Sequence, residues 1–133
     1  MGMDQYIYVI FPSREATDLN SHTSLDQRQY VQEFRKDYDM HDALVPFFID
    51  AVSKVNGNVL TKREVDGQGY MGIRLTPEML DAIAEHRPTP CRDVFMGSDE
   101  CVTCYKDNLV AESVKAAHKA MAQDMMVYYS ADW

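Results

Sequence analysis

The sequence predicts an α+β protein with a mixed, mostly antiparallel sheet and helices packed on one face of it. One observation is an uninterrupted apolar, β-rich run near the N-terminus, which is typical of a strand buried on both faces. A second is a series of segments whose apolar residues recur every three or four positions, which indicates amphipathic helices. The expected order is β-α-α-β-β-α-β-β-α, and part of it matches the β-α-β-β-α-β pattern of ferredoxin-like sandwiches.

The apolar run is Tyr6–Phe11, and we expect it to form a central strand. Pro12 ends it, and a polar, aperiodic stretch that is typical of an exposed loop follows. A first helix is predicted from Ser24, which has the capping-box relation to Gln27. Apolar residues then recur at helical spacing as far as Tyr38, which favours a helix over this stretch.

A second and stronger helix is expected over Leu44–Val55, because its apolar residues form one continuous stripe. Pro46 is expected in the first turn, where its missing N–H costs least. Asn56 and Gly57 form a natural C-terminal stop. This helix should share a core with the next one, through a common set of buried residues: Phe47, Phe48, Val52, Leu80 and Ile83.

The middle of the chain predicts a hairpin followed by a helix. The expected strands are Val59–Val65 and Tyr70–Leu75, and the Asp66–Gly69 segment between them contains the Asp-Gly pair that tight hairpin turns favour. The next helix should begin with Thr76 as its N-cap and Pro77 at its first helical position. It is expected to end before the prolines that follow it.

The last third predicts two short strands, at Asp93–Met96 and Cys101–Tyr105, and a long final helix over Leu109–Tyr129. The helix is indicated by an apolar stripe with steps of three and four residues. The members of that stripe are Val110, Val114, Ala117, Met121, Met125 and Tyr128.

The bulk composition predicts one globular domain over residues 1–133. The chain is 46% hydrophobic and 26% charged, which are ordinary values for a folded protein of this length. Its formal net charge is −8 and neither half carries a basic stripe, so no direct nucleic-acid binding is expected. No apolar run has the length of a membrane span and no secretory pattern occurs, so we expect a cytoplasmic protein without membrane contact.

The most specific motif is a cluster of thiols with one imidazole, formed by His86, Cys91, Cys101 and Cys104. Thiolates and imidazole suit zinc, and a zinc-stabilised structural domain is therefore one alternative. Strong zinc signatures contain two Cys-x-x-Cys pairs, however, and this cluster has one. In the strand expected at Cys101–Tyr105, the sulfurs of Cys101 and Cys104 would also face opposite sides of the sheet. We therefore expect free buried thiols, no metal and no other cofactor.

The sequence contains none of the common motifs of nucleophilic catalysis, phosphate binding or metal-dependent proteolysis. No histidine stands at a known spacing from a nucleophile, and no phosphate-binding loop or metalloprotease motif occurs. His41 lies near a helix start, where capping and surface hydration explain it, and His118 is expected on a solvated helix face. A small enzyme whose site is gathered by the fold remains the second functional hypothesis.

The leading hypothesis is a small acidic binding module that acts by protein–protein contact, as an inhibitor or regulator of the type found among phage and mobile-element accessory proteins. The partner is expected to have a basic surface, and a homodimer is a further expectation. The C-terminus is apolar on more than one face, so a contact surface is predicted there, with core filling by the tail as the alternative. The predicted binding residues are Met125, Met126, Tyr128, Tyr129 and Trp133.

Overall fold

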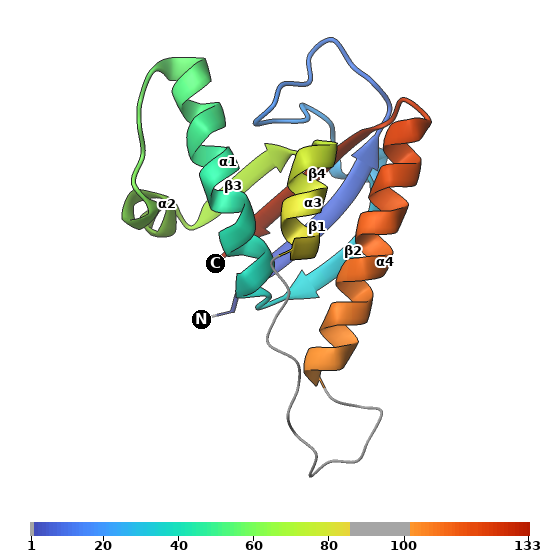
Figure 1. The fold of residues 1–133 in the computed structure, drawn as a ribbon. Helices are drawn as coiled ribbons and strands as arrows, with labels where there is room; N and C mark the ends of the chain where they lie inside the picture. Colours follow the sequence, from blue (N-terminus) through green and yellow to red (C-terminus); the bar gives the residue numbers. More distant parts are fainter. Residues whose placement is uncertain (1, 86–101) are drawn as a thin grey trace.

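The computed structural model describes residues 2–85 and 102–133, with side chains except at 102–108. The sheet contains four strands in the order β2-β1-β4-β3, and every pairing is antiparallel (Figure 1). The strands are β1 (Asp4–Ile10), β2 (Gln29–Arg35), β3 (Tyr70–Arg74) and β4 (Met126–Asp132). The first and last strands of the chain therefore lie side by side in the middle of the sheet. The predicted central position of the first strand is confirmed.

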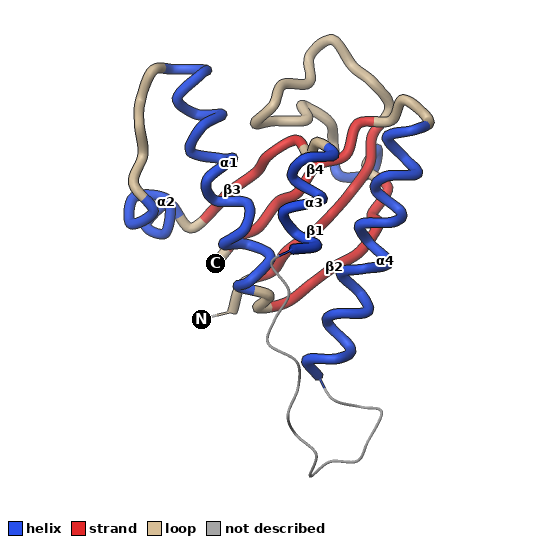
Figure 2. The backbone as a smooth tube through the Cα atoms, viewed as in Figure 1, coloured by secondary structure: helices blue, strands red, loops and turns tan. Residues whose placement is uncertain are grey.

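Helices cover one face of this sheet, as Figures 1 and 2 show. They are α1 (Tyr38–Asn56), α2 (Lys62–Gln68), α3 (Pro77–Glu85) and α4 (Val102–Ala122), and a short 3-10 turn, η1 (Leu25–Gln27), precedes β2. The predicted α+β class with helices on one face is confirmed. The order along the described residues is β-β-α-α-β-α-α-β, which differs from the expected order in its details.

The core lies between the sheet and α1, α3 and α4. Ile7, Tyr129 and Ile73 from three strands are fully buried in it. Of the residues expected to be buried together, Phe48, Val52, Leu80 and Ile83 belong to this core, and Phe47 packs against it half-buried.

The helix α1 begins earlier than the sequence predicted. Asp37 is its N-cap and accepts a hydrogen bond from the Met40 N–H at 3.2 Å. At the other end Gly57 adopts the left-handed conformation, with φ of 76°, and its N–H donates to the Ser53 carbonyl. The predicted C-terminal stop is therefore confirmed. Pro46 lies inside the helix and not in its first turn, because the capping side chain stands nine residues before it.

The predicted strand Val59–Val65 is wrong, because α2 occupies most of this stretch. Thr61 and Glu64 form a reciprocal capping box: each side chain accepts from the other residue's backbone N–H at 3.2 Å. Gly69 then ends the helix with a φ of 72°. The capping box of Thr61 and Glu64 therefore outweighs the β propensity of Val59. The second predicted strand of this pair exists as β3.

The helix predicted from Ser24 to Tyr38 is also wrong. Only η1 is helical, and β2 follows it. Phe34 points into the core, whereas Tyr30 pairs with Tyr8 on the other face of the sheet. The pairing shifts register between Ile7 and Tyr8, which is a β-bulge. This extra residue in β2 spaces the apolar side chains in a way that mimics a helical period.

The final helix is predicted too long at its C-terminal end. It ends at Ala122, and Asp124 turns the chain with a left-handed φ of 60° into β4. Because β4 lies between β1 and β3 with both faces covered, its residues are apolar at consecutive positions, which does not distinguish a strand from a helix. The strand predicted at Cys101–Tyr105 is wrong from Val102 onward, where α4 runs. The strand predicted at Asp93–Met96 lies outside the described residues.

Candidate functional site

The face of the sheet opposite the helices is covered over only part of its area. The loop between β1 and β2 covers the part where Tyr8 and Tyr128 lie. The Tyr8 hydroxyl donates to the Ser21 Oγ at 3.3 Å, and the Tyr128 hydroxyl donates to the Thr17 carbonyl at 2.7 Å. Burial raises the pKa of Tyr128 to about 12. This loop therefore anchors both tyrosine hydroxyls.

A row of four tyrosine rings crosses three strands from this covered part toward the open part. Tyr128 stacks on Tyr8 with ring centroids 5.7 Å apart, and the Tyr30 ring meets Tyr8 edge-on at 6.1 Å. Tyr6 then meets Tyr30 at 5.6 Å. Arg28 places its guanidinium 4.5 Å from the centre of the Tyr8 ring, which is a cation–π contact. The protein thus already uses this row to hold one cation.

The other end of the row is open to solvent. Tyr30 is 48% exposed and Tyr6 is half-buried. Tyr70 of β3 is 55% exposed, and its ring lies over Gly72, where a Cβ would stand 2.6 Å from the Tyr70 hydroxyl. A glycine at this position of β3 is therefore what lets the tyrosine ring lie flat along the sheet.

Carboxylates surround these open rings. Asp4 of β1 and Asp132 of β4 are directly opposite each other, which places two like charges on neighbouring strands. Glu33 of β2 is opposite Tyr6. Arg35 pairs with Asp4 at 3.8 Å, but both side chains are well exposed, so this ion pair is weak. We call the set Asp4, Tyr6, Tyr30, Glu33, Tyr70 and Asp132 the open face.

The electrostatics of Tyr6 show that the carboxylates act together. Burial is the largest influence that raises the pKa of Tyr6, and Glu33, Asp4 and Asp132 each raise it further. All three acids therefore contribute a negative potential at one hydroxyl group. Such a surface attracts a cation, because carboxylates bind it directly and tyrosine rings bind it through their π faces.

A second polar cluster lies inside the protein. The Gln5 amide donates to the Tyr129 hydroxyl and to the Asp37 carbonyl, each at 2.9 Å, and accepts from the Asp37 N–H at 2.7 Å. His41 Nδ1 is 3.0 Å from the Tyr129 hydroxyl, and the Trp133 ring meets the imidazole edge-on with centroids 4.9 Å apart. This cluster joins β1, α1 and β4 and has a structural role.

The expectation of surface hydration for His41 is wrong, because this side chain is only 2% exposed. Its Nε2 is buried with no hydrogen-bond partner in the part of the chain that the structure describes. Burial lowers the pKa of His41, against the opposing effects of Asp42 and Asp66. Burial also raises the pKa of Tyr129. The histidine is therefore neutral and out of reach of a substrate. His118 is exposed on α4, as expected.

The structure gives each of the five predicted binding residues a place in the monomer. Met126, Tyr128 and Tyr129 are buried in β4. Met125 is half-buried in the turn before it, and Trp133 donates from its indole Nε1 to the Asp66 carbonyl at 2.7 Å. The monomer therefore covers much of the apolar surface that a partner was expected to cover. A contact role for these residues stays a prediction.

The thiol cluster cannot be placed. His86, Cys91 and Cys101 lie outside the described residues, as does the side chain of Cys104. Among the described side chains, no three His, Cys, Asp or Glu residues lie in a position to hold a metal ion. Within the described ranges, no helix has both the length and the apolar character that a bilayer span requires.

The open face is the feature that the sequence analysis missed. Tyr6 was assigned to the apolar strand and Tyr30 to a helix stripe, while Asp4 and Asp132 stand at opposite ends of the chain. One signal existed: two aromatic residues stand two positions apart at Tyr6 and Tyr8, which places them on one face of a strand. Strand pairing, which brings these stretches together, was not available from the sequence.

No protein-family model, curated protein or solved structure matches this chain.

Proposed function

We propose that this protein is an acidic binding module that holds a basic protein segment on its open face. The observation that carries the proposal is the strand register, which places Glu33 opposite Tyr6 and Asp132 opposite both Asp4 and the exposed Tyr70. Lysine and arginine side chains of a partner would pair with Asp4, Glu33 and Asp132, and their cationic heads would lie on the rings.

Two further properties support a basic partner. Asp4 and Asp132 are directly opposite each other, and Asp4 has only the weak, exposed ion pair with Arg35, so a partner's cation between the two carboxylates would offset the repulsion that remains. The net charge of −8 would speed the encounter with a positively charged surface. By occupying a surface that its partner uses for another purpose, a module of this kind acts as an inhibitor or regulator.

Three labelled peptides of equal length test the proposal, with alternating arginine, glutamine or glutamate. Fluorescence anisotropy at low salt should show that the arginine peptide binds at least about tenfold more tightly than the glutamine peptide. Added salt should weaken this binding, because exposed charges are screened. Asp132→Asn should lower the affinity about threefold or more, and Tyr30→Ala should do the same through the lost cation–π contact.

Asp81→Asn is the matched control, because Asp81 is an exposed acid on α3, in the helical layer. It changes the net charge by the same amount and should leave the affinity within about twofold of the wild type. Equal losses in Asp81→Asn and Asp132→Asn would show general attraction to an acidic protein and would refute a specific open face.

A further inference from the structure

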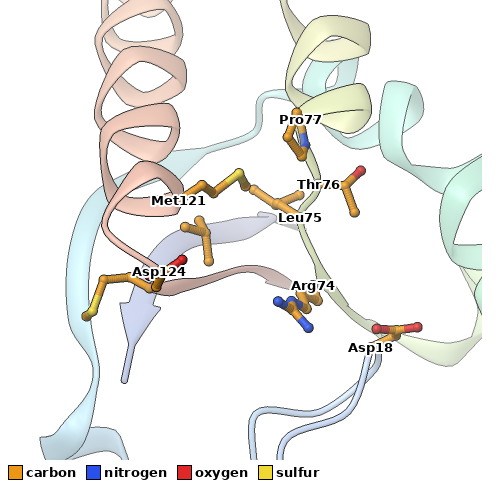
Figure 3. A pocket seen from close by; sticks show the side chains of 9 residues that line it. Asp18, Arg74, Leu75, Thr76, Pro77, Met121 and Asp124 are labelled. Atoms are coloured by element: carbon orange, nitrogen blue, oxygen red, sulfur yellow. The ribbon is translucent and has the colours of Figure 1, made fainter. Parts of the chain in front are cut away.

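A cavity of about 320 Å³ lies at the opposite end of the sheet from the open face. Three connecting segments meet there: the loop after β1, the link from β3 to α3, and the turn from α4 to β4 (Figure 3). Its volume is at the lower end of the range for small-molecule sites, which is about 300–1,000 Å³. The residues that line it are Asp18, Arg74, Leu75, Thr76, Pro77, Met121, Asp124, Met125 and Val127.

The cavity has an apolar side and a charged side. Leu75 and Val127 are buried, and Met121 and Met125 are half-buried, so the apolar side is made largely of flexible thioethers and branched aliphatic chains. On the charged side, Figure 3 shows Arg74 between Asp18 and Asp124.

The backbone around the cavity is held in place by hydrogen bonds between the segments. The Arg74 N–H donates to the Asp18 carbonyl at 2.7 Å, and the Leu75 N–H donates to the Val127 carbonyl at 2.8 Å. Asp124 lies in the turn after α4, where its backbone adopts the left-handed conformation. The charged side chains therefore stand on a preformed frame, which lowers the cost of ordering a site for a ligand.

Arg74 is half-buried, yet its guanidinium forms no ion pair with any residue in the described part of the chain. A guanidinium presents several N–H donors in a plane that matches a carboxylate. The two aspartates close by would repel a multiply charged anion such as a phosphate ester. They would attract a cationic group on the same ligand.

We propose that this cavity binds a small zwitterion with an apolar side chain, of the class of free aliphatic or thioether α-amino acids. The ligand carboxylate pairs with Arg74, its ammonium group pairs with Asp124 and Asp18, and its side chain packs against Met121 and Met125. This inference goes beyond the proposed function, because the residues involved are separate from the open face.

Calorimetric titration of the intact protein with L-leucine and L-methionine tests the inference. At least one should bind saturably below about 10 mM. Isocaproate lacks the ammonium group of leucine, isoamylamine lacks the carboxylate, and glycine lacks the side chain. Each of the three should bind at least about tenfold more weakly than the amino acid, because each loses one of the three contacts.

Variants place the binding in the cavity. Arg74→Gln and Asp124→Asn should each weaken amino-acid binding about tenfold or more, whereas the exposed Arg63→Gln and Asp81→Asn should not change it. If a cavity variant does not fold, the analogue series on the intact protein still decides. Isocaproate or isoamylamine binding as tightly as leucine would overturn the inference, and so would no saturable binding of either amino acid.

Discussion

At the scale of single residues, His41 is the group whose environment departs most from what the sequence indicated. The helix start and the neighbouring aspartates are local features that favour a hydrated histidine. Its burial depends on Tyr129 and Trp133, which lie far along the chain and come to it through β4. No local pattern contains that information, so a buried polar contact between distant segments could not be predicted.

The burial of His41 predicts a stability that depends on pH. Its pKa is lowered in the folded protein from the usual 6.5, so the unfolded chain binds a proton at higher pH than the folded chain does. The free energy of unfolding should therefore be unaffected by this group above pH 6.5 and fall as the pH drops below it. The slope contributed by one group is at most about 1.4 kcal/mol per pH unit.

Urea unfolding of the wild type and of His41→Asn between about pH 7.5 and pH 5 measures this slope. The variant should lose the His41 contribution, although its stability at neutral pH will be lower. His118→Gln is the control, because this histidine is exposed, and should keep the wild-type slope. A wild-type slope that survives in His41→Asn would contradict the assignment.

At the scale of elements, the sequence pattern succeeds where local signals decide the structure. Periodicity and caps predicted α1 and α3, an uninterrupted apolar run predicted the first strand, and the segment after the Asp-Gly pair was predicted as the strand that is β3; all four exist. Two of the errors fall where a neighbouring strand decides. A β-bulge gave β2 a helical spacing, and double burial removed the alternation from β4. A local capping box, in a segment predicted as a strand, explains the error at α2.

The packing of α1 on α3 gives a prediction at this scale. Phe48 is buried in the core that contains Leu80 and Ile83. Phe48→Ala should lower the free energy of unfolding by about 3–5 kcal/mol, because it removes buried ring surface and leaves a cavity. Val55→Ala is the matched control on the same helix, since Val55 is 65% exposed, and should cost less than about 1 kcal/mol. Equal losses in the two variants would contradict this packing.

At the scale of the whole molecule, the fold separates two kinds of surface. The helices and the core lie on one side of the sheet, and the tyrosine row with its carboxylates lies on the other. Asp4 and Asp132 come together because β1 and β4 are neighbours, so the two ends of the chain jointly build the open face. The expected acidic contact protein remains a proposal, now with a defined surface. The expected homodimer stays a prediction.

An amide chemical-shift map of the protein titrated with the arginine peptide tests most directly whether the open face is the binding surface. Saturable shifts should be confined to the open face, at Asp4–Tyr6 of β1, Tyr30–Glu33 of β2, Tyr70 of β3 and Asp132 of β4. Shifts should be absent from the exposed residues of α1 and α3, because those helices lie on the opposite side of the sheet. Shifts centred on the helical layer, or scattered over every acidic residue, would contradict the claim that the open face binds a basic partner.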